Sequence, residues 1–279
     1  MPLARAKVNL WLQVVGRRSD GYHLLDSLVA FADLADTLQV APFDRLSLAL
    51  DGPAAAALDG EGDNLVLKAA RLLAEHSGVT SGASLRLTKR IPVAAGLGGG
   101  SADAAATLRA LVELWRLKLP EQQLLGLAAR LGADVPMCLV GRTALASGIG
   151  EKLSPAPPLP TCGLLLVNPG KALPTAEVFA ARRGDFSRPA PIDRPWSDLA
   201  SLVEALSRRG NDLTAAASTL CPAIADVLAF LRRSPGARHA AMSGSGASCF
   251  ALYDTRAGAE RAGAQVPVAW WWHAGELAG

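Results

Sequence analysis

The sequence predicts an α+β protein with two domains. Strand patterns and helix patterns occur in both halves of the chain, half of the 279 residues are hydrophobic, and a proline-rich connector lies near the middle. A chain of this length can bury a large core, and it reaches the size at which single cores divide into two. We therefore place the domains at 1–154 and 161–279, on either side of the connector at 156–160.

The first strand is the clearest element of the N-terminal domain. Between Ala4 and Val14 the even-numbered positions are apolar, whereas the odd-numbered positions include Lys7 and Asn9. Period two is the pattern of a strand, so Lys7 and Asn9 are expected on one face of it. After a turn signal at Asp20-Gly21, further strands are predicted at 24–32, 37–41, 45–50 and 84–89.

Helices are predicted where apolar residues recur three and four positions apart. The first helix follows Asn64, which can cap it, and ends at Gly78. The second starts near Ser101 and the third covers 121–131. Val135 precedes a proline and is expected to be extended, which places Asp134 where a helix gives way to a strand.

The C-terminal domain shows the same mixture of elements. Its predicted helices lie near 175–183, 198–207 and 222–232, and its predicted strands near 162–167, 239–242, 248–253 and 266–272. The last strand contains the three consecutive tryptophans Trp270 to Trp272. Such a cluster is expected to form a buried or partner-facing edge, and we assign it no chemistry.

A glycine-rich loop directly before the second helix is the most informative segment. It reads Pro92-Val93-Ala94-Ala95-Gly96-Leu97-Gly98-Gly99-Gly100-Ser101-Ala102. The first N–H groups of a helix lack internal partners and point outward at the positive end of its dipole, and glycines let a pyrophosphate approach them. A flexible turn is the alternative, but four glycines in five positions exceed what a turn needs. The loop is therefore predicted to bind phosphate.

Features that the loop lacks exclude a Walker loop and weaken a dinucleotide-binding interpretation. No Lys-Ser or Lys-Thr pair closes it as in a Walker loop, its glycines do not fit the dinucleotide-binding pattern, and protein-kinase signatures are absent.

The formal charge of +3 comes with dispersed arginines, which gives little support for a nucleic-acid partner. The four cysteines form no Cys-x-x-Cys pair, so neither a zinc site nor a disulfide scaffold is expected. No leader or membrane-spanning run is evident, and we expect a cytoplasmic protein without a membrane partner.

The glycine-rich loop resembles that of the GHMP kinases, the superfamily of galactokinase, homoserine kinase, mevalonate kinase and phosphomevalonate kinase. Six further segments stand in the order and spacing of one family within it: Ala6-Lys7-Val8-Asn9-Leu10, Asp20-Gly21-Tyr22-His23, Gly132-Ala133-Asp134-Val135-Pro136, Asn168-Pro169-Gly170, Asn211-Asp212-Leu213 and Met242-Ser243-Gly244-Ser245-Gly246-Ala247-Ser248. The resemblance covers residues 4 to about 255. It implies a two-domain GHMP kinase fold, with a left-handed βαβ crossover in the N-terminal domain and a ferredoxin-like C-terminal domain.

The activity that this resemblance implies is the transfer of the γ-phosphoryl group of ATP, accompanied by Mg²⁺. The acceptor is the 2-hydroxyl of a cytidine-diphosphate-linked methylerythritol, an intermediate of non-mevalonate isoprenoid precursor biosynthesis. Asp134 is then the base that accepts the hydroxyl proton, and Lys7 its electrostatic partner. Tyr22 and Phe179 would hold the cytosine ring and His23 its polar edge, with Asn9 and Thr175 as further substrate-binding candidates.

Two other functions remain open at this point. The chain could be a different small-molecule GHMP kinase, acting for example on homoserine or a mevalonate derivative, or a nucleotide-binding regulator without chemistry. Singly, Asp134 could be a helix-end turn residue and Lys7 a solvated strand residue. Gly99 and Gly100 replace the serines of the broader superfamily, so Ser101 alone offers a hydroxyl to Mg²⁺, and Asp103 would repel phosphate unless it points away or meets the metal. The metal ligands and the oligomeric state stay open.

Overall fold

The chain forms two compact units in a computed structural model that describes residues 3–58, 64–192 and 195–278. Unit 1 comprises Met1–Ala6, Leu34–Val93 and Gly98–Gly141, and unit 2 comprises Lys7–Asp33, Ala94–Leu97 and Arg142–Gly279. Both units draw on strand β2 (His23–Phe43), which is 21 residues long. The units are therefore assembled from several segments, whereas the predicted domain bounds 1–154 and 161–279 follow the chain and stay a prediction.

Unit 1 is built around a βαβ crossover. Strands β3 (Leu46–Asp51) and β4 (Gly82–Thr88) pair in parallel, and a short 3₁₀ turn (Ala55–Leu58) and helix α1 (Leu65–Ser77) lie between them in the chain. The C-terminal part of β2 pairs antiparallel with β4, from Thr37 opposite Thr88 to Phe43 opposite Gly82. Parallel strands need such a long connection, because a tight hairpin turn joins only antiparallel neighbours.

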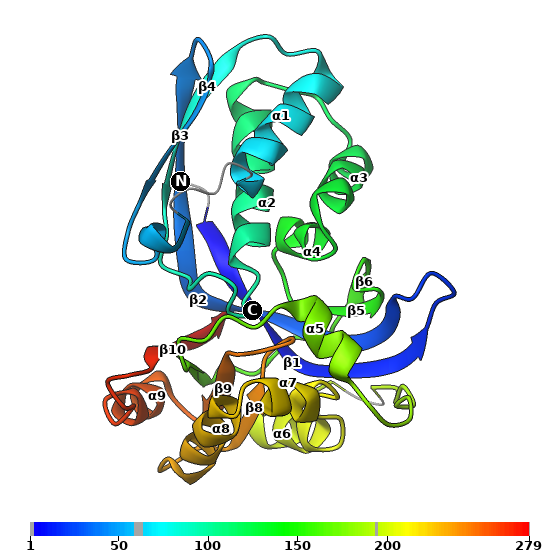
Figure 1. The fold of residues 1–279 in the computed structure, drawn as a ribbon, viewed down its shortest axis with the longest axis vertical. Coiled ribbons are helices and arrows are strands. Elements are labelled where there is room, and N and C mark those ends of the chain that lie inside the picture. The colour runs from blue at the N-terminus through cyan, green and yellow to red at the C-terminus, as the bar shows by residue number, and fades with distance from the viewer. Residues whose placement is uncertain (1–2, 59–63, 193–194, 279) are drawn as a thin grey trace. The chain divides into compact units, whose positions relative to one another are not determined.

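Four helices of unit 1 pack against one another, as Figure 1 shows for α1, α2 (Gly99–Leu114), α3 (Glu121–Leu131) and α4 (Val135–Val140). Helix α1 begins as predicted: the Oδ1 atom of Asn64 accepts a hydrogen bond from the Val66 N–H over 2.9 Å, and Gly78 ends the helix with φ of 65°. Helix α2 is alanine-rich and buried along most of its first three turns, which allows its neighbours to approach closely.

The prediction that Asp134 precedes a strand is wrong, because Asp134 precedes helix α4. Val135 is its first residue and Pro136 its second, and Asp134 is already close to helical geometry, with φ of −86° and ψ of −12°. The restriction on the residue before a proline is outweighed here, because a proline in the first turn of a helix lacks only an N–H that would have no partner.

The second half of unit 2 has ferredoxin-like topology, as predicted. Strands β7 (Gly163–Asn168), β8 (His239–Met242), β9 (Cys249–Tyr253) and β10 (Trp271–Ala278) form an antiparallel sheet in the order β10-β7-β9-β8. Between β7 and β8 lie α5 (Thr175–Ala181), α6 (Leu199–Ser207), α7 (Thr214–Leu220) and α8 (Ala223–Arg233), and α9 (Arg256–Gly263) connects β9 to β10. Helices α8 and α9 pack on this sheet (Figure 1).

The first half of β2 belongs to unit 2 with β5 (Ala144–Gly148), β6 (Lys152–Pro155) and, from Lys7 onward, β1 (Leu3–Arg17). Strand β2 pairs with β1 and with β5, and β5 pairs with β6. The two strands predicted at 24–32 and 37–41 are thus one strand. The segment between them, residues 33–36, contains no glycine or proline that would break it. The sequence pattern missed β5, β6, α7 and α9.

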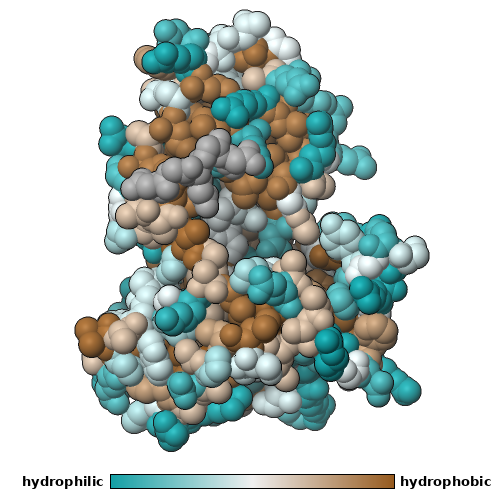
Figure 2. Space-filling model, in the orientation of Figure 1, coloured by the Kyte–Doolittle hydropathy of each residue, from teal (hydrophilic) through white to brown (hydrophobic). Residues whose placement is uncertain are grey.

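Strand β10 begins at Trp271, five residues later than predicted, and the tryptophan cluster lies at its start. Trp270 packs edge-on against Phe230 of α8 with ring centroids 5.9 Å apart, and Trp272 covers Gly263 of α9, where a Cβ atom would lie 2.5 Å from the indole ring. Val268 is fully exposed and Trp272 is 41% exposed. Figure 2 shows hydrophobic residues at the surface in this region. In the described part of the chain, no helix has the length and apolar character needed to span a bilayer.

Candidate active site

Lys7 and Asn9 lie on one face of β1, as the alternation predicts, and both are buried. The Lys7 ammonium donates a hydrogen bond to Oδ1 of Asn9 over 2.7 Å, and Nδ2 of Asn9 donates to the Ser27 hydroxyl over 2.8 Å. The Ser27 hydroxyl in turn donates to the Trp11 carbonyl oxygen. The Asn9 amide is therefore fixed at both ends, and it orients the Lys7 side chain.

The middle of the glycine-rich loop lies against a second glycine loop within unit 2. The Lys7 N–H donates to the Leu97 carbonyl oxygen over 2.9 Å, and the Ser248 N–H donates to that of Ala95 over 3.2 Å. Gly96 has φ of +73°, and a Cβ atom there would lie 2.5 Å from the carbonyl oxygen of Gly246. The two loops thus meet through bare backbone, beside Lys7 and Asn9.

Two motif residues, Asn168 and Asn211, together with Thr175, hold the second glycine loop, residues 243–248. The Asn211 amide donates to the carbonyl oxygens of both Met242 and Gly244 over 2.8 Å. The Asn168 amide donates to the Ser248 hydroxyl over 2.9 Å, and the Thr175 and Ser245 hydroxyls are hydrogen-bonded over 2.9 Å. No role was predicted for Asn168 or Asn211, and both support the loop. A plain turn between strands would not need this many partners.

The lysine also approaches the second loop. A Cβ atom on Gly244, which has φ of +58°, would lie 3.3 Å from Oδ1 of Asn9 and 3.6 Å from the Lys7 ammonium nitrogen. The Asn9 N–H donates to the Ser243 hydroxyl over 3.1 Å. Unit 2 therefore brings together a buried ammonium group, an oriented amide and two glycine loops, an arrangement suited to an anionic ligand.

In unit 1, helix α2 begins inside the glycine-rich loop. Gly98 precedes it in the left-handed conformation with φ of 65°, and no side chain caps the helix, so the first N–H groups point out of its end. A Cβ atom on Gly99 would lie 3.1 Å from the Ile91 side chain, and one on Gly100 would lie 3.4 Å from Leu65. These glycines therefore serve backbone conformation and close packing, in addition to the access for phosphate that the sequence suggests.

Asp103, the fifth residue of α2, points away from the exposed end of the helix. Its Oδ2 atom lies 2.6 Å from the Lys89 ammonium nitrogen, which is also 2.5 Å from Oδ2 of Asp36. Burial raises the pKa of Asp103 to about 7, with the charge of Lys89 acting against this shift and that of Asp36 adding to it. Burial alone would lower the pKa of Lys89, but the two carboxylates raise it, so the lysine stays charged.

Lys89 and Asp36 were not predicted as site residues. A carboxylate such as Asp103 among the buried alanines of α2 requires a cation nearby, which is the signal that could have revealed the cluster. The partner itself could not be named, since several lysines and arginines precede the loop.

Asp134 is at the N-terminus of α4 in unit 1 and is partly buried. Its side chain accepts no capping hydrogen bond from the helix. The role of Asp134 as the catalytic base stays a prediction.

His23 and Phe179 are brought together in unit 2. Their rings stack with centroids 5.2 Å apart and an interplanar angle of 25°, whereas Tyr22 is 60% exposed. Burial, followed by the charges of Arg17 and Arg182, lowers the pKa of His23, so its ring is neutral at pH 7. A neutral imidazole has one donor and one acceptor, which suits it to the polar edge of a base.

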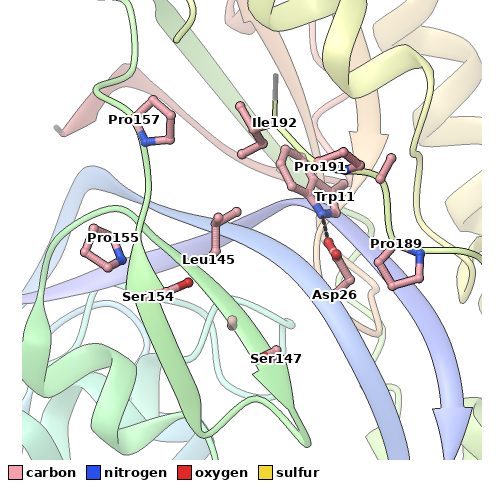
Figure 3. Close-up of a pocket in the computed structure, with 12 residues that line it drawn as sticks. Trp11, Asp26, Leu145, Ser147, Ser154, Pro155, Pro157, Pro189, Pro191 and Ile192 are labelled. Carbon is pink, nitrogen blue, oxygen red and sulfur yellow. Dashed lines mark hydrogen bonds between the residues drawn. The ribbon is translucent and has the colours of Figure 1, made fainter. Parts of the chain in front are cut away.

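A separate pocket of about 500 Å³ lies in unit 2 (Figure 3). Trp11 donates its indole N–H to Asp26 over 2.7 Å at one wall, and prolines form much of the remainder. The described residues that line the pocket include none of the predicted site residues.

Two family models identify the class of protein. The model for the GHMP kinases N terminal domain matches residues 64–142, and that for the GHMP kinases C terminal matches residues 192–270. The chain is therefore a GHMP kinase, an ATP-dependent phosphotransferase with the two-domain α+β fold that the sequence predicts.

Similar proteins narrow the assignment to one family. The chain is 53% identical over 279 residues to the 4-diphosphocytidyl-2-C-methyl-D-erythritol kinase of Rhodospirillum rubrum, covering 99% of this chain and 92% of that protein. It is 53% identical over 271 residues to the same kinase of Paramagnetospirillum magneticum, covering 96% and 95% of the two chains. The chain belongs to the 4-diphosphocytidyl-2-C-methyl-D-erythritol kinase family.

Solved structures agree with this family and show how widely the fold is shared. A crystal structure of 4-(cytidine 5'-diphospho)-2C-methyl-D-erythritol kinase superimposes with a TM-score of 0.84 at 40% identity, covering 99% of this chain and 98% of that one. A homoserine kinase from Cytophaga hutchinsonii superimposes with a TM-score of 0.68 at 20% identity, covering 98% and 95%. The second similarity concerns the fold alone.

Proposed function

We propose that the chain transfers the γ-phosphoryl group of ATP to the 2-hydroxyl of 4-diphosphocytidyl-2-C-methyl-D-erythritol, in non-mevalonate isoprenoid precursor biosynthesis. Close relatives carry the name of this kinase. The single structural observation that carries the proposal is the meeting of the two glycine loops at Gly96 and Gly246 beside the buried, Asn9-bound ammonium group of Lys7. The backbone of the two loops and the Lys7 ammonium group lie close together, and such an arrangement can bind phosphoryl oxygens.

ATP is held by residues 92–102 in this proposal. The uncapped N–H groups at the start of α2 bind phosphate oxygens, and the positive end of the helix dipole adds to the attraction. The position of Asp103 supports this assignment, because its carboxylate is bound to Lys89 and does not oppose the phosphates at the end of the helix. Ser101 adds a hydroxyl group in the first turn.

The chemical step uses Asp134 and Lys7. Asp134 accepts the proton of the 2-hydroxyl as its oxygen attacks the γ-phosphorus, so that the O–H bond breaks as the O–P bond forms and ADP leaves. Lys7 stabilises the negative charge that develops on the attacking and equatorial oxygens. Asn9 supports this role, since its amide oxygen fixes the position of the ammonium group.

The cytidine end of the acceptor binds at Tyr22, His23 and Phe179. The stacked pair of His23 and Phe179 supplies an aromatic surface with a neutral, hydrogen-bonding ring beside it, and Tyr22 is exposed and available to a ligand. Base stacking on aromatic side chains contributes about 1–3 kcal/mol for each base. Asn9 and Thr175 are assigned to the diphosphate or the polyol.

Mg²⁺ is proposed to arrive as the companion of ATP. The described residues contain no group of three or more histidine, cysteine, aspartate or glutamate side chains placed to hold a metal ion, and Asp103 is bound to Lys89. They do not fit a site built by the protein alone, and no step of the reaction is assigned to the metal. Binding through ATP phosphates and water is the usual mode for this ion.

A coupled assay for ADP release tests the proposal. ATP should be turned over with 4-diphosphocytidyl-2-C-methyl-D-erythritol, and not with homoserine, mevalonate or phosphomevalonate. Cytidine diphosphate should compete with the acceptor, whereas uridine and guanosine diphosphates should compete weakly. Turnover of one of the other alcohols in place of the cytidylylated one would show a different GHMP kinase, and ATP binding without turnover of any acceptor would show a regulator.

A further inference from the structure

A buried ion cluster, made of Lys89, Asp36 and Asp103, lies beneath the glycine-rich loop in unit 1. The three side chains are at most 4% exposed. One ammonium nitrogen joins the two carboxylates, at 2.5 Å from Asp36 and 2.6 Å from Asp103. The second oxygen of Asp103 accepts no hydrogen bond from any described residue. Lys89 thus connects Asp103 to the strand side of the cluster.

The cluster joins the two ends of the glycine-rich loop. Before the loop, Oδ1 of Asp36 accepts the backbone N–H groups of Arg90 and Ile91 over 2.5 and 2.9 Å. After the loop, Asp103 is the fifth residue of α2, immediately beyond Ala102. The segment that enters the loop and the helix that leaves it are therefore held to one ammonium group.

The contact continues into the start of the helix. A Cβ atom on Gly99 would lie 3.3 Å from the Lys89 ammonium nitrogen and 3.1 Å from Ile91. A shift of Lys89 would consequently move the residues whose N–H groups begin α2. Helix ends near reacting groups tolerate little displacement, since a misplacement of about 1 Å can cost about 10²-fold in rate.

Stability alone is a weak reason for such a cluster. Burying an ion pair costs desolvation that its attraction barely repays, and well-packed apolar residues often do as well or better. Here two carboxylates face one ammonium group, which is a poorer balance than a simple pair. What the cluster provides, and apolar packing does not, is a directional link between two named backbone segments.

We propose that Lys89, held by Asp36 and Asp103, is a positioning residue that sets the start of α2 against residues 90–91 and so aims the helix N–H groups at the phosphates of ATP. The inference rests on the proposed binding of ATP by residues 92–102. It assigns a task to three residues that do not themselves touch the nucleotide phosphates.

Two substitutions at one position test the link. Asp103→Asn keeps an oxygen that can accept from Lys89, whereas Asp103→Ala removes it and leaves a neutral Lys89–Asp36 pair. The KM for ATP and the Kd for β,γ-imido-ATP should rise about tenfold or more in Asp103→Ala and stay within about threefold in Asp103→Asn. The KM for the acceptor should be unchanged in both variants.

Thr107→Ala is the matched control. Thr107 is fully buried one turn further along α2, and its hydroxyl donates to the Asp103 carbonyl oxygen over 2.8 Å. This variant removes a buried hydrogen bond to the Asp103 backbone and leaves the three side chains of the cluster unchanged, so ATP binding should not change. Equal loss of ATP binding in Thr107→Ala and Asp103→Ala would overturn the inference, because it would show general weakening of the helix.

A second variant covers the case in which Asp103→Ala does not fold. Lys89→Met, Asp36→Asn and Asp103→Asn together remove every charge of the cluster at nearly constant volume. If it melts near the wild-type temperature and still binds β,γ-imido-ATP with wild-type affinity, the positioning role is refuted; folding with weakened binding supports it. If the wild-type chain itself fails to bind the analogue, the proposed function fails first, which separates the two conclusions.

Discussion

The α-carbon of Gly96 faces the carbonyl oxygen of Gly246 so closely that a Cβ atom would lie 2.5 Å from it. The Ser243 carbonyl oxygen would be only 3.0 Å from the same atom. Two glycine-rich segments, about 150 residues apart in the chain, are therefore packed backbone against backbone. Any side chain at Gly96 must separate them.

Gly96→Ala should lower the free energy of unfolding by about 1–3 kcal/mol, because it adds a clash at a residue with φ of +73°. Kinase activity should fall further than stability at temperatures where the protein stays folded. Gly126→Ala is the control, since Gly126 lies within α3 with nothing within 4 Å of a new Cβ atom. That change should stabilise the protein by about 0.5–1 kcal/mol. Urea denaturation measures both, and a neutral effect of Gly96→Ala would contradict the close packing.

Asp134→Asn should lower kcat by about 10² to 10⁴, because the amide cannot accept the hydroxyl proton. The Kd for β,γ-imido-ATP should stay near the wild-type value, which isothermal titration can measure. Wild-type turnover in this variant would remove Asp134 from the mechanism.

Phe179→Ala should raise the KM for the acceptor by about 5- to 150-fold, the equivalent of the 1–3 kcal/mol of one stacking contact. The KM for ATP should not change. Phe186→Ala serves as control, because Phe186 is 48% exposed and pairs with the Arg182 guanidinium instead of His23. Equal effects of the two substitutions would speak against stacking at Phe179.

Stability should depend on pH through Asp103. Its pKa is raised to about 7 in the folded chain from an ordinary value of 3.8, mainly by burial. The folded state then binds more protons than the unfolded state between these values, so this group's contribution to stability falls as pH rises, by at most about 1.4 kcal/mol per pH unit. Asp103→Asn lacks this loss and should gain stability relative to wild type from pH 5 to pH 8. Urea titrations across this range measure the difference, and a difference that is constant with pH would contradict it.

Acceptor binding should be insensitive to pH above 7 and weaken on acidification below the ordinary histidine range. The reason is that burial and the charges of Arg17 and Arg182 lower the pKa of His23, which keeps the ring neutral. Arg17→Met should move the midpoint of this loss to higher pH, because it removes one of the positive charges. A pH profile of acceptor KM checks both statements, and an unmoved midpoint would exclude an effect of Arg17.

Short-range sequence patterns predicted individual strands and helices of this fold. The alternation of β1 placed Lys7 and Asn9 on one face, and the bounds of α3 follow from apolar spacing and Gly132. The same signals failed at Val135, where a proline in the first helical turn outweighs the preference of the residue before it, and at α9, which is short and arginine-rich.

Long-range parts of the site were beyond reach of the pattern. The cluster joins Asp36 of β2, Lys89 just after β4 and Asp103 of α2. Asp36 lies 53 residues before Lys89, and no spacing rule links the three. Similarly, the amide of Asn211 acts on Gly244 only because the sheet brings them together. The sequence draws attention to Asp103 and to the motif at Asn211, whereas their side-chain partners become known only from the fold.

The uneven placement of tryptophan gives the two units distinguishable optical signals. Of the six tryptophans, Trp115 alone belongs to unit 1, where it ends α2, and the other five belong to unit 2. Intrinsic fluorescence of the wild-type chain therefore reports mainly on unit 2. The difference between wild type and Trp115→Phe isolates an emission from the far end of the helix that begins at the glycine-rich loop, and offers a built-in reporter for nucleotide titrations without an attached dye.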